Sequence, residues 1–284
     1  MTNTLEQRDR ADDKHALDLS GVPETMLWPL WNRAISSSQR NPLISDLWAE
    51  KLVGELDFDF AGHFGRPSVF HAIRARVGDD LVREYASWRS CPTVIALGEG
   101  LDCQRLRINE DSIRWYSVDV PEAMDVRRRF VDRPNEEVRI ARSALDTRWM
   151  DEVDNCEAPF ISACGLLMYF DERDVRDLLA AIAERFPGAE LYFDTIPPHF
   201  SRKTMKGFNV TPTYTAPPMP WGISTDDIAG FAEPLGFRPI SVRTYAQPYP
   251  ERLRFYAFLS RFKRIRNALA GSLAHLRAGP RELT

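Results

Sequence analysis

The chain of 284 residues contains few cysteines and no long apolar run. Its cysteines stand at positions 91, 103, 156 and 164, with neither a Cys-x-x-Cys spacing nor neighbouring histidines. This pattern argues against a zinc site or a disulfide framework, and it predicts free thiols in a reducing compartment. Residues 1–14 are polar and lack the apolar core of a signal peptide, and no segment is long enough to span a membrane. We therefore expect a cytoplasmic protein without a metal site.

The composition also lacks an excess of charge of one sign. Lys and Arg number 37 and Asp and Glu number 41, for a net charge of −4, which gives no overall attraction to nucleic acid or to an anionic membrane. With 44% hydrophobic residues, the chain suits one large α/β domain, with or without a small added cap. We expect a small-molecule partner, no nucleic acid or membrane partner, and a monomer or homodimer.

Several nucleotide and hydrolase motifs are missing. The chain has no phosphate loop of the Gly-x-x-x-x-Gly-Lys type and no Gly-x-Ser-x-Gly. What is present is an apolar run, 94–97, that leads directly into Gly98 and Gly100. Such a run is typical of a buried parallel strand, and the glycines allow a sharp turn and a close approach to a ligand. The third glycine of a dinucleotide fingerprint is absent, because Cys103 stands in its place.

An acidic residue completes this pattern. Asp119 lies about twenty residues beyond the glycines, at the end of a second strand-like run, 113–118. In nucleotide-binding folds, a carboxylate at this position holds a ribose. The combination predicts an adenosine-binding site.

The order of elements predicts a helical block followed by an α/β core. We expect residues 1–18 to be disordered and residues 19–92 to form an N-terminal helical lid. Beyond residue 93 the apolar patterns alternate, which favours a doubly wound, mostly parallel sheet. The predicted strands are 93–97, 113–118, 137–140, 159–163, 189–195, 238–245 and 253–260. The main predicted helices are 121–131, 171–186 and 225–235, and 101–108 is expected to be a helix or a turn.

Two segments depart from this alternation. Residues 196–221 are rich in proline and aromatic residues, which predicts an insertion in the core, 93–260, that covers a pocket. Residues 261–277 are basic and amphipathic, so 261–284 is expected to be a basic C-terminal tail with a solvated helix, rather than a membrane-binding or partner-binding helix.

The glycine turn and the segment that follows it resemble a known family. Gly98-Glu99-Gly100-Leu101-Asp102, Arg107 and the run from Trp115 to Glu122 resemble the leucine carboxyl methyltransferase superfamily, particularly bacterial polyketide O-methyltransferases of the tetracenomycin type. Further matching segments are 21–25, 33–34, 74–76, 143–146 with Trp149, and 165–169. The resemblance implies a class I methyltransferase fold: a Rossmann-like, seven-stranded, mostly parallel sheet with an N-terminal helical lid.

The resemblance also implies S-adenosyl-L-methionine as cofactor and assigns residues to it. Asp119 is expected to bind both ribose hydroxyls, with Gly98 and Gly100 against the ribose and the amino-acid part. Ala144 and Leu145 are expected to flank the adenine. Among the arginines, Arg76 is expected to bind the methionine carboxylate, Arg33 either to assist or to be an exposed helix charge, and Arg74 to be an exposed helix charge.

Three places depart from the family pattern, one of which is Cys103-Gln104, where the family usually has Thr-Arg. Glu99 replaces a small residue, and Cys164 replaces an acid that would serve the ammonium group of the cofactor. Because neighbouring strand ends lie about 4.8 Å apart, we hypothesise that Glu99 supplies this carboxylate instead.

The implied reaction is O-methylation of a carboxylate or a phenol on a small, polyketide-like metabolite. A phenol would benefit from a base, for which the candidates are His71, His63 and the best-placed His199, which is otherwise an exposed loop histidine. Tyr169 is expected to face the acceptor or to pack beneath the lid. Phe200, Tyr214 and Trp221 are expected to stack on the acceptor or to form the insertion's own core. The alternative is a methyltransferase-fold protein that binds S-adenosylmethionine or S-adenosylhomocysteine without methyl transfer, or that catalyses a different reaction.

Overall fold

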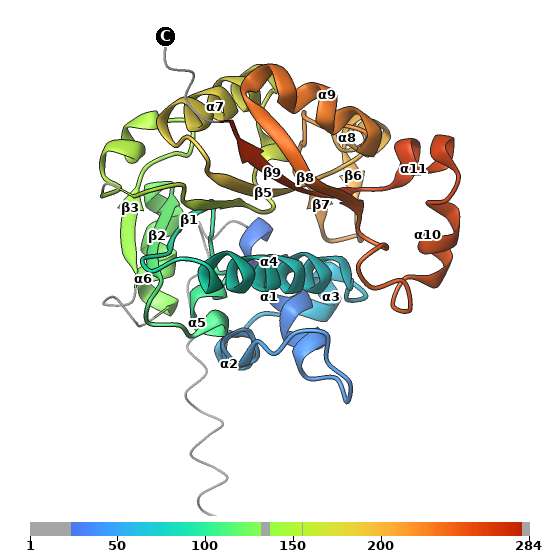
Figure 1. The fold of residues 1–284 in the computed structure, drawn as a ribbon. Helices are drawn as coiled ribbons and strands as arrows, with labels where there is room; N and C mark the ends of the chain where they lie inside the picture. The colour runs from blue at the N-terminus through green and yellow to red at the C-terminus, as the bar shows by residue number, and fades with distance from the viewer. Residues whose placement is uncertain (1–23, 132–136, 155, 280–284) are drawn as a thin grey trace, which may run out of the picture.

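A seven-stranded sheet forms the centre of the molecule in the computed structural model, which describes residues 24–131, 137–154 and 156–279 (Figure 1). The strand order is β3-β2-β1-β4-β5-β9-β8. Strands β1 to β5 pair in parallel, and β9 is antiparallel to both β5 and β8. Their bounds are β1 (Thr93–Leu97), β2 (Arg114–Asp119), β3 (Val138–Ala141), β4 (Phe160–Ala163), β5 (Glu190–Thr195), β8 (Phe237–Thr244) and β9 (Ser272–Ala278).

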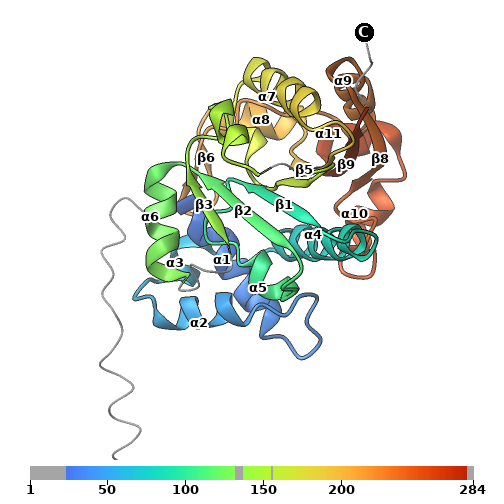
Figure 2. The same ribbon diagram turned by 60° about the vertical axis from the view of Figure 1, so that its left-hand side comes forward.

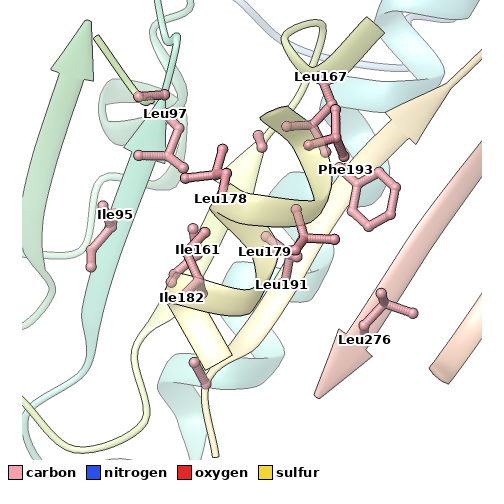
Figure 3. Close-up of a cluster of buried hydrophobic side chains, with 14 of the residues drawn as sticks. Ile95, Leu97, Ile161, Leu167, Leu178, Leu179, Ile182, Leu191, Phe193 and Leu276 are labelled. Carbon is pink, nitrogen blue, oxygen red and sulfur yellow. The ribbon is translucent and has the colours of Figure 1, made fainter. Parts of the chain in front are cut away.

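Both faces of the central strands are buried, as expected for a parallel sheet between two helical layers. In β1, Ile95 and Leu97 belong to one apolar core and Val94 and Ala96 to the other, because successive side chains point to opposite faces. Helix α7 (Glu172–Arg185) packs on the first face, where Leu178 lies among the strand side chains (Figure 3).

Four helices precede the sheet: α1 (Glu24–Ser37), α2 (Leu47–Glu55), α3 (Phe60–Phe64) and α4 (Phe70–Ser87). Asp46 and Asp59 accept backbone N–H groups at the starts of α2 and α3, which explains where these helices begin. With α5 (Gln104–Ile108), this block covers the face opposite α7, and α6 (Pro121–Phe130) packs beside β2 and β3 (Figures 1 and 2). The predicted helical lid is therefore present in residues 24–87.

The insertion after β5 contains α8 (Pro198–Thr204) and a small antiparallel pair, β6 (Phe208–Asn209) and β7 (Thr215–Ala216). The predicted helix 225–235 is broken into η4 (Thr225–Asp227), α9 (Ile228–Ala232) and η5 (Glu233–Leu235). Two short turns of 3-10 helix, η2 (Thr147–Asp151) and η3 (Leu167–Tyr169), flank β4. The predicted parallel strands and the helices 121–131 and 171–186 agree with the structure to within a few residues.

The C-terminal part corrects two predictions. Residues 253–260 form helix α10 (Arg254–Leu259) and not a strand, and they are followed by α11 (Lys263–Leu269). The expected basic tail, 261–284, instead supplies β9, which lies inside the sheet between β5 and β8. The polar residue His275 is accommodated there because Glu190 of β5 lies 2.9 Å from its ring nitrogen, a partner that local sequence does not reveal.

The expected disorder of residues 1–18 falls outside the described residues.

Candidate active site

The glycine turn after β1 has the geometry that its sequence demands. Gly98 and Gly100 have φ values of 64° and 52°, which favour glycine over other residues. A Cβ atom on Gly98 would lie 2.7 Å from a methyl carbon of Leu166. The turn is joined to the neighbouring strand because the Gly100 N–H donates to Asp119 Oδ2 at 2.8 Å. The two glycines and Asp119, which the sequence analysis singled out, are therefore in direct contact.

A cavity of about 210 Å³ opens at this turn, at the C-terminal ends of β1, β2 and β4. The lid contributes side chains from α1 and α4 to its wall. Among the sequence-predicted residues, those that line it are Arg33, Gly98, Glu99, Gly100, Asp119, Cys164 and Tyr169. The structure therefore brings together most of the expected cofactor residues.

Asp119 retains hydrogen-bonding capacity. Its Oδ2 accepts the Gly100 N–H, and its Oδ1 accepts the Val120 N–H at 2.9 Å. Burial raises the pKa of Asp119, and these two N–H groups oppose the rise. Each carboxylate oxygen has a second lone pair, so the side chain can also accept hydrogen bonds from a diol.

The carboxylate of Glu99 contacts side chains of β2 and α6. Its Oε2 accepts the Ser117 hydroxyl at 2.7 Å, and its Oε1 lies 3.1 Å from Nη2 of Arg127. Burial raises the pKa of Glu99 to about 7, against the opposing effect of Arg127. These contacts point toward β2 and α6, and they favour a bracing role for Glu99. Its hypothesised contact with a cofactor ammonium group stays a prediction.

Arg127 is a residue of the site that the sequence did not single out. It is fully buried in α6, and its Nη1 donates to the carbonyls of Gly100 at 2.9 Å and Asp102 at 2.7 Å. Glu137 pairs with its other nitrogens, with a shortest separation of 2.7 Å. Arg127 thus fixes the backbone of the glycine turn. The string of arginines at 127–129 gives no signal of which one is buried.

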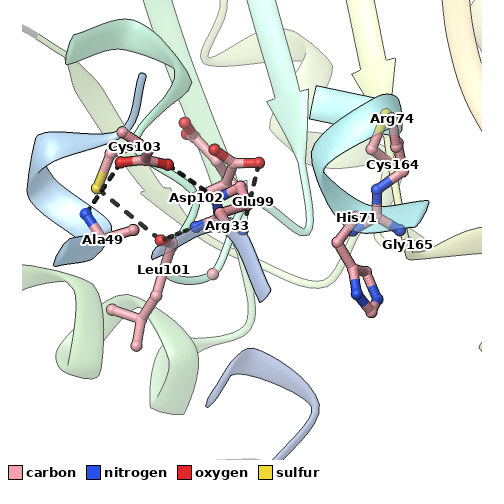
Figure 4. Close-up of polar contacts among 12 residues, drawn as sticks. Arg33, Ala49, His71, Arg74, Glu99, Leu101, Asp102, Cys103, Cys164 and Gly165 are labelled. Carbon is pink, nitrogen blue, oxygen red and sulfur yellow. Dashed lines mark hydrogen bonds and ion pairs between the residues drawn. The ribbon is translucent and has the colours of Figure 1, made fainter. Parts of the chain in front are cut away.

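Arg33 is buried rather than an exposed helix charge. Its Nε donates to Asp46 at 2.9 Å and its Nη2 to the Leu101 carbonyl at 2.8 Å (Figure 4). Arg107 connects the same Asp46 to Asp102, with distances of 2.9 and 2.6 Å. This network attaches the lid to the glycine turn and places Arg33 on the cavity wall.

The two arginines of α4 exchange their expected places. Arg76 is exposed, donates to Asp80 on its own helix at 2.9 Å, and does not line the cavity. Arg74 is buried, lines the cavity and donates to Asp194 at 3.0 Å. Residues two apart on a helix point in nearly opposite directions, so only one of the pair can face the sheet. This corrects the expected placement of Arg76.

The expected adenine-flanking residues do not line the cavity. The carbonyl of Ala144 accepts the Trp149 indole N–H at 3.0 Å, and Leu145 is partly exposed. The expected catalytic His199 is exposed on α8, away from the cavity wall. His199 therefore has the exposed position that the sequence analysis gave as the alternative to a catalytic role.

The aromatic residues of the insertion do not form one platform. Phe200 packs against Phe208, and Trp221 joins the apolar core beneath α9. Tyr214 packs against Trp28 of α1, with ring centres 5.5 Å apart. None of the three insertion aromatics lines the cavity, whereas Tyr169 does, and burial raises the pKa of Tyr169 to about 12.

His71 has a defined protonation pattern. Asn32 Oδ1 accepts the Ser68 N–H at 2.7 Å, so its amide nitrogen is the group that faces His71 Nδ1 at 2.8 Å. Nδ1 must then be the acceptor, and the neutral ring carries its proton on Nε2. Burial, together with Arg74 and Arg33, keeps the pKa of His71 well below its usual value. His71 lies beside Arg74 in Figure 4.

The donor set fits an S-adenosyl cofactor. Gly98 and Gly100 place no side chain of their own against a ligand, and Asp119 can accept from a ribose diol. The buried guanidinium groups of Arg33 and Arg74 suit a carboxylate. Burial raises the pKa of Cys164, which keeps this thiol neutral. Across the described ranges, no cluster of His, Cys, Asp or Glu suitable for a metal ion occurs. In the same residues no helix has the length and apolar character to cross a membrane.

The sheet order and the glycine turn facing Asp119 define a class I methyltransferase fold. The chain belongs to the leucine carboxyl methyltransferase family, whose model matches residues 27–183. This membership confirms the expected class of protein and S-adenosyl-L-methionine as its cofactor.

Two relatives agree with this assignment, and a solved structure shares the fold. The chain is 28% identical to the tetracenomycin polyketide synthesis O-methyltransferase TcmP of Streptomyces glaucescens over 63% of this chain and 68% of the relative. It is 26% identical to the S-adenosyl-L-methionine-dependent methyltransferase dpfgK of Gibberella zeae over 61% of this chain and 64% of the relative. A candidate methyltransferase from Thermobifida fusca shares the fold, with a TM-score of 0.56, 14% identity and coverage of 88% of this chain and 94% of that one.

Proposed function

We propose that the protein transfers the methyl group of S-adenosyl-L-methionine to a carboxylate oxygen of a small, polyketide-like molecule. The observation that carries the choice of a carboxylate is that no histidine lines the described cavity wall, so the usual base for a phenol is missing from it. A carboxylate is ionised at neutral pH and needs no base, whereas an ordinary phenol, with a pKa of about 10, does.

Each ionisable group of the wall supports this reading. Although burial alone would raise the pKa of Asp102, Arg107 and Arg33 hold it well below its usual range. Glu99 has a pKa that burial raises to about 7, but its carboxylate faces Ser117 and Arg127. Tyr169 and Cys164 are neutral near pH 7. The remaining wall carboxylate, Asp119, has a raised pKa but is occupied by the ribose in this proposal, so no carboxylate of the wall is assigned as a base for a phenol.

His71 does not supply the missing base. Its one basic nitrogen, Nδ1, already accepts the Asn32 amide. The ring instead presents an N–H donor at Nε2, one turn of α4 before Arg74. His71 does not line the cavity wall either, but it lies beside Arg74, which does, so we propose His71 in place of His199 as the histidine nearest the reaction.

The cofactor supplies an electrophilic methyl group on a sulfonium sulfur. The chain's contribution is to hold the reactants in line and to exclude water. In this proposal Asp119 binds the ribose, Arg74 and Arg33 bind the methionine carboxylate, and the lid helices α1 and α4 close the cavity. The TcmP relative is described as an O-methyltransferase of polyketide synthesis, which supports the acceptor class.

The test uses matched aromatic acceptors, each supplied as a carboxylic acid and as the corresponding phenol, with methyl-labelled S-adenosyl-L-methionine. We expect label in the acid, released as volatile methanol by mild alkali because a methyl ester hydrolyses. Alkali-stable label on the phenol would overturn the choice of carboxylate. Binding of S-adenosylhomocysteine without any transfer across the panel would favour the alternative, a cofactor-binding protein without methyltransferase activity.

A further inference from the structure

The connection between β8 and β9 carries α10 and α11, which project at the edge of the molecule (Figure 1). We call residues 250–270 the α10–α11 arm. Neither helix contains a buried residue. Helices of six and seven residues are not stable alone in water, so they depend on packing of their side chains. The arm therefore has apolar surface that its contacts with the body of the protein leave exposed.

This surface is aromatic. Phe255, Phe258 and Phe262 expose 69, 54 and 51% of their surface, and Tyr256 exposes 50%. Phe258 and Phe262 pack mainly on each other, edge to face, with ring centres 5.7 Å apart. Exposed apolar patches of this kind usually mark an interaction surface.

The same surface is strongly basic, although the whole chain has a net charge of −4. Six cations stand at positions 252, 254, 261, 263, 264 and 266, and Glu251 is the one acid of the arm. Lys263 and Arg266 pair with Asp226. Arg254, Arg261 and Arg264 are exposed and form no ion pair with any residue that the structure describes.

A groove of about 280 Å³ lies between two of these unpaired cations. Arg254 and Arg261 line it together with one acid, Glu251, so its charged lining has a net positive charge. Its apolar part consists of Pro250, Ala257 and Phe258. Guanidinium groups bind phosphate oxygens in pairs, so the groove combines a phosphate-binding rim with an apolar floor.

We propose that the α10–α11 arm is a docking surface for an anionic lipid bilayer. Aromatic rings enter the interfacial region of a bilayer while neighbouring cations reach the lipid phosphates. An acidic protein partner would also complement the positive charge of the arm. However, two projecting short helices suit a flat bilayer better than they suit a partner helix, which binds in a groove longer than this one. The association is peripheral, since it uses only the faces of α10 and α11.

The arm is connected to the lid. The ring of Tyr256 packs on Phe70, the first residue of α4, with ring centres 5.7 Å apart. Arg74, on the cavity wall, lies one turn further along the same helix. Bilayer contact would thus bring the lid beside the phase in which apolar acceptors concentrate.

The proposal is tested by sedimentation of the full chain with vesicles of phosphatidylcholine alone or with one third phosphatidylglycerol. We expect binding to the anionic vesicles only, weakened at 500 mM salt relative to 50 mM because screening shortens the reach of the cations. The double variant R254Q/R261Q should bind about 30-fold more weakly, since each cation near such a surface contributes about five-fold. F258S/F262S should also lose binding.

Matched controls change the same residue types elsewhere. Trp88→Ser removes an aromatic side chain that is 82% exposed, and R128Q/R129Q removes two exposed arginines of α6. Both should bind vesicles like the parent. Each variant is first checked for S-adenosylhomocysteine binding, and the salt series on the unmodified chain decides the question if an arm variant does not fold.

Three results would overturn the proposal: no binding to anionic vesicles, equal binding to neutral vesicles, or arm variants that bind like the controls. Retention on an immobilised acidic protein without vesicle binding would also overturn it and assign the arm to a protein partner. Vesicle binding requires no methyl transfer, so this result is independent of the proposed reaction.

Discussion

Arg74 of the lid and Asp194 at the end of β5 form a buried ion pair, with Nη1 and Oδ2 3.0 Å apart (Figure 4 shows Arg74). The same carboxylate accepts the Gly165 N–H at 2.5 Å and the Tyr245 hydroxyl at 2.6 Å. Asp194 therefore fixes three chain segments around the cavity: α4, the end of β4 and the start of the β8–β9 connection. It also fixes the direction of the Arg74 guanidinium group.

The two arginines of α4 provide a matched pair of variants. We expect Arg74→Met to weaken S-adenosylhomocysteine binding by about 10- to 100-fold, the range for a hydrogen bond to a charged group. Arg76→Met, on the exposed face, should leave the affinity within about two-fold, because exposed ion pairs contribute little. Calorimetric titration of both variants checks this, and equal losses in the two would refute the assignment of Arg74.

Removal of the Asp194 charge should act through Arg74. We expect Asp194→Asn to weaken binding of S-adenosylhomocysteine by about 10-fold or more, because Arg74 loses the partner that orients it. Methylthioadenosine, which lacks the amino-acid carboxylate, should lose much less affinity. A purely structural defect would weaken both ligands equally. Tyr245→Phe keeps the ion pair and should show a smaller loss than Asp194→Asn.

Asp119 should be required for the nucleoside part of the cofactor. Asp119→Ala removes the acceptor of the Gly100 N–H together with the ribose-binding carboxylate, so we expect both S-adenosylhomocysteine and methylthioadenosine to bind at least about 10-fold more weakly. The control is Asp125→Asn, an exposed acid of α6. Affinity for methylthioadenosine that survives in Asp119→Ala would show that the ribose lies elsewhere.

The sequence predicted those parts of the site that depend on local pattern. The apolar run 94–97, the two glycines and Asp119 each have a conformation or a chemistry that few other residues could supply, and the structure places them together. The choice between Arg74 and Arg76 depended on which face of α4 meets the sheet, and both arginines fit the family motif equally well. A rotation of one helix by less than half a turn would exchange them.

The errors at the C-terminus have a different physical origin. Residues 253–260 are mostly apolar and aromatic, which is typical of a strand, but β9 is the strand that pairs with β8, and 253–260 instead contain α10. Residues 272–278 look like part of a basic tail, yet Glu190 lies beside His275 and Arg277 and makes β9 compatible with the sheet interior. The net charge of −4 does not reveal the local basic surface of the α10–α11 arm, so the expectation of no membrane partner, which was drawn from that net charge, stays a prediction that the vesicle experiment tests.

Glu99 is the residue whose role a pH series can decide. Burial raises its pKa in the folded protein to about 7, above its value in the unfolded chain. Between about pH 5 and 8 the folded state then binds more protons at this group than the unfolded state, so Glu99 lowers stability as the pH rises. His71 acts in the opposite direction, because its lowered pKa costs stability as the pH falls below about 6.5.

The two effects are separated by subtracting the wild-type curve from that of Glu99→Gln, measured by urea unfolding. The difference should shift in favour of the variant from pH 5 to pH 8, by at most about 3 kcal/mol. Because Ser117 and Arg127 already occupy the carboxylate, we expect S-adenosylhomocysteine affinity at pH 8 to change by less than about three-fold, since no ligand contact is lost. A loss of S-adenosylhomocysteine affinity of ten-fold or more, with intact affinity for methylthioadenosine, would instead show that Glu99 binds the ammonium group of the cofactor. The neutral thiol of Cys164 cannot take that role.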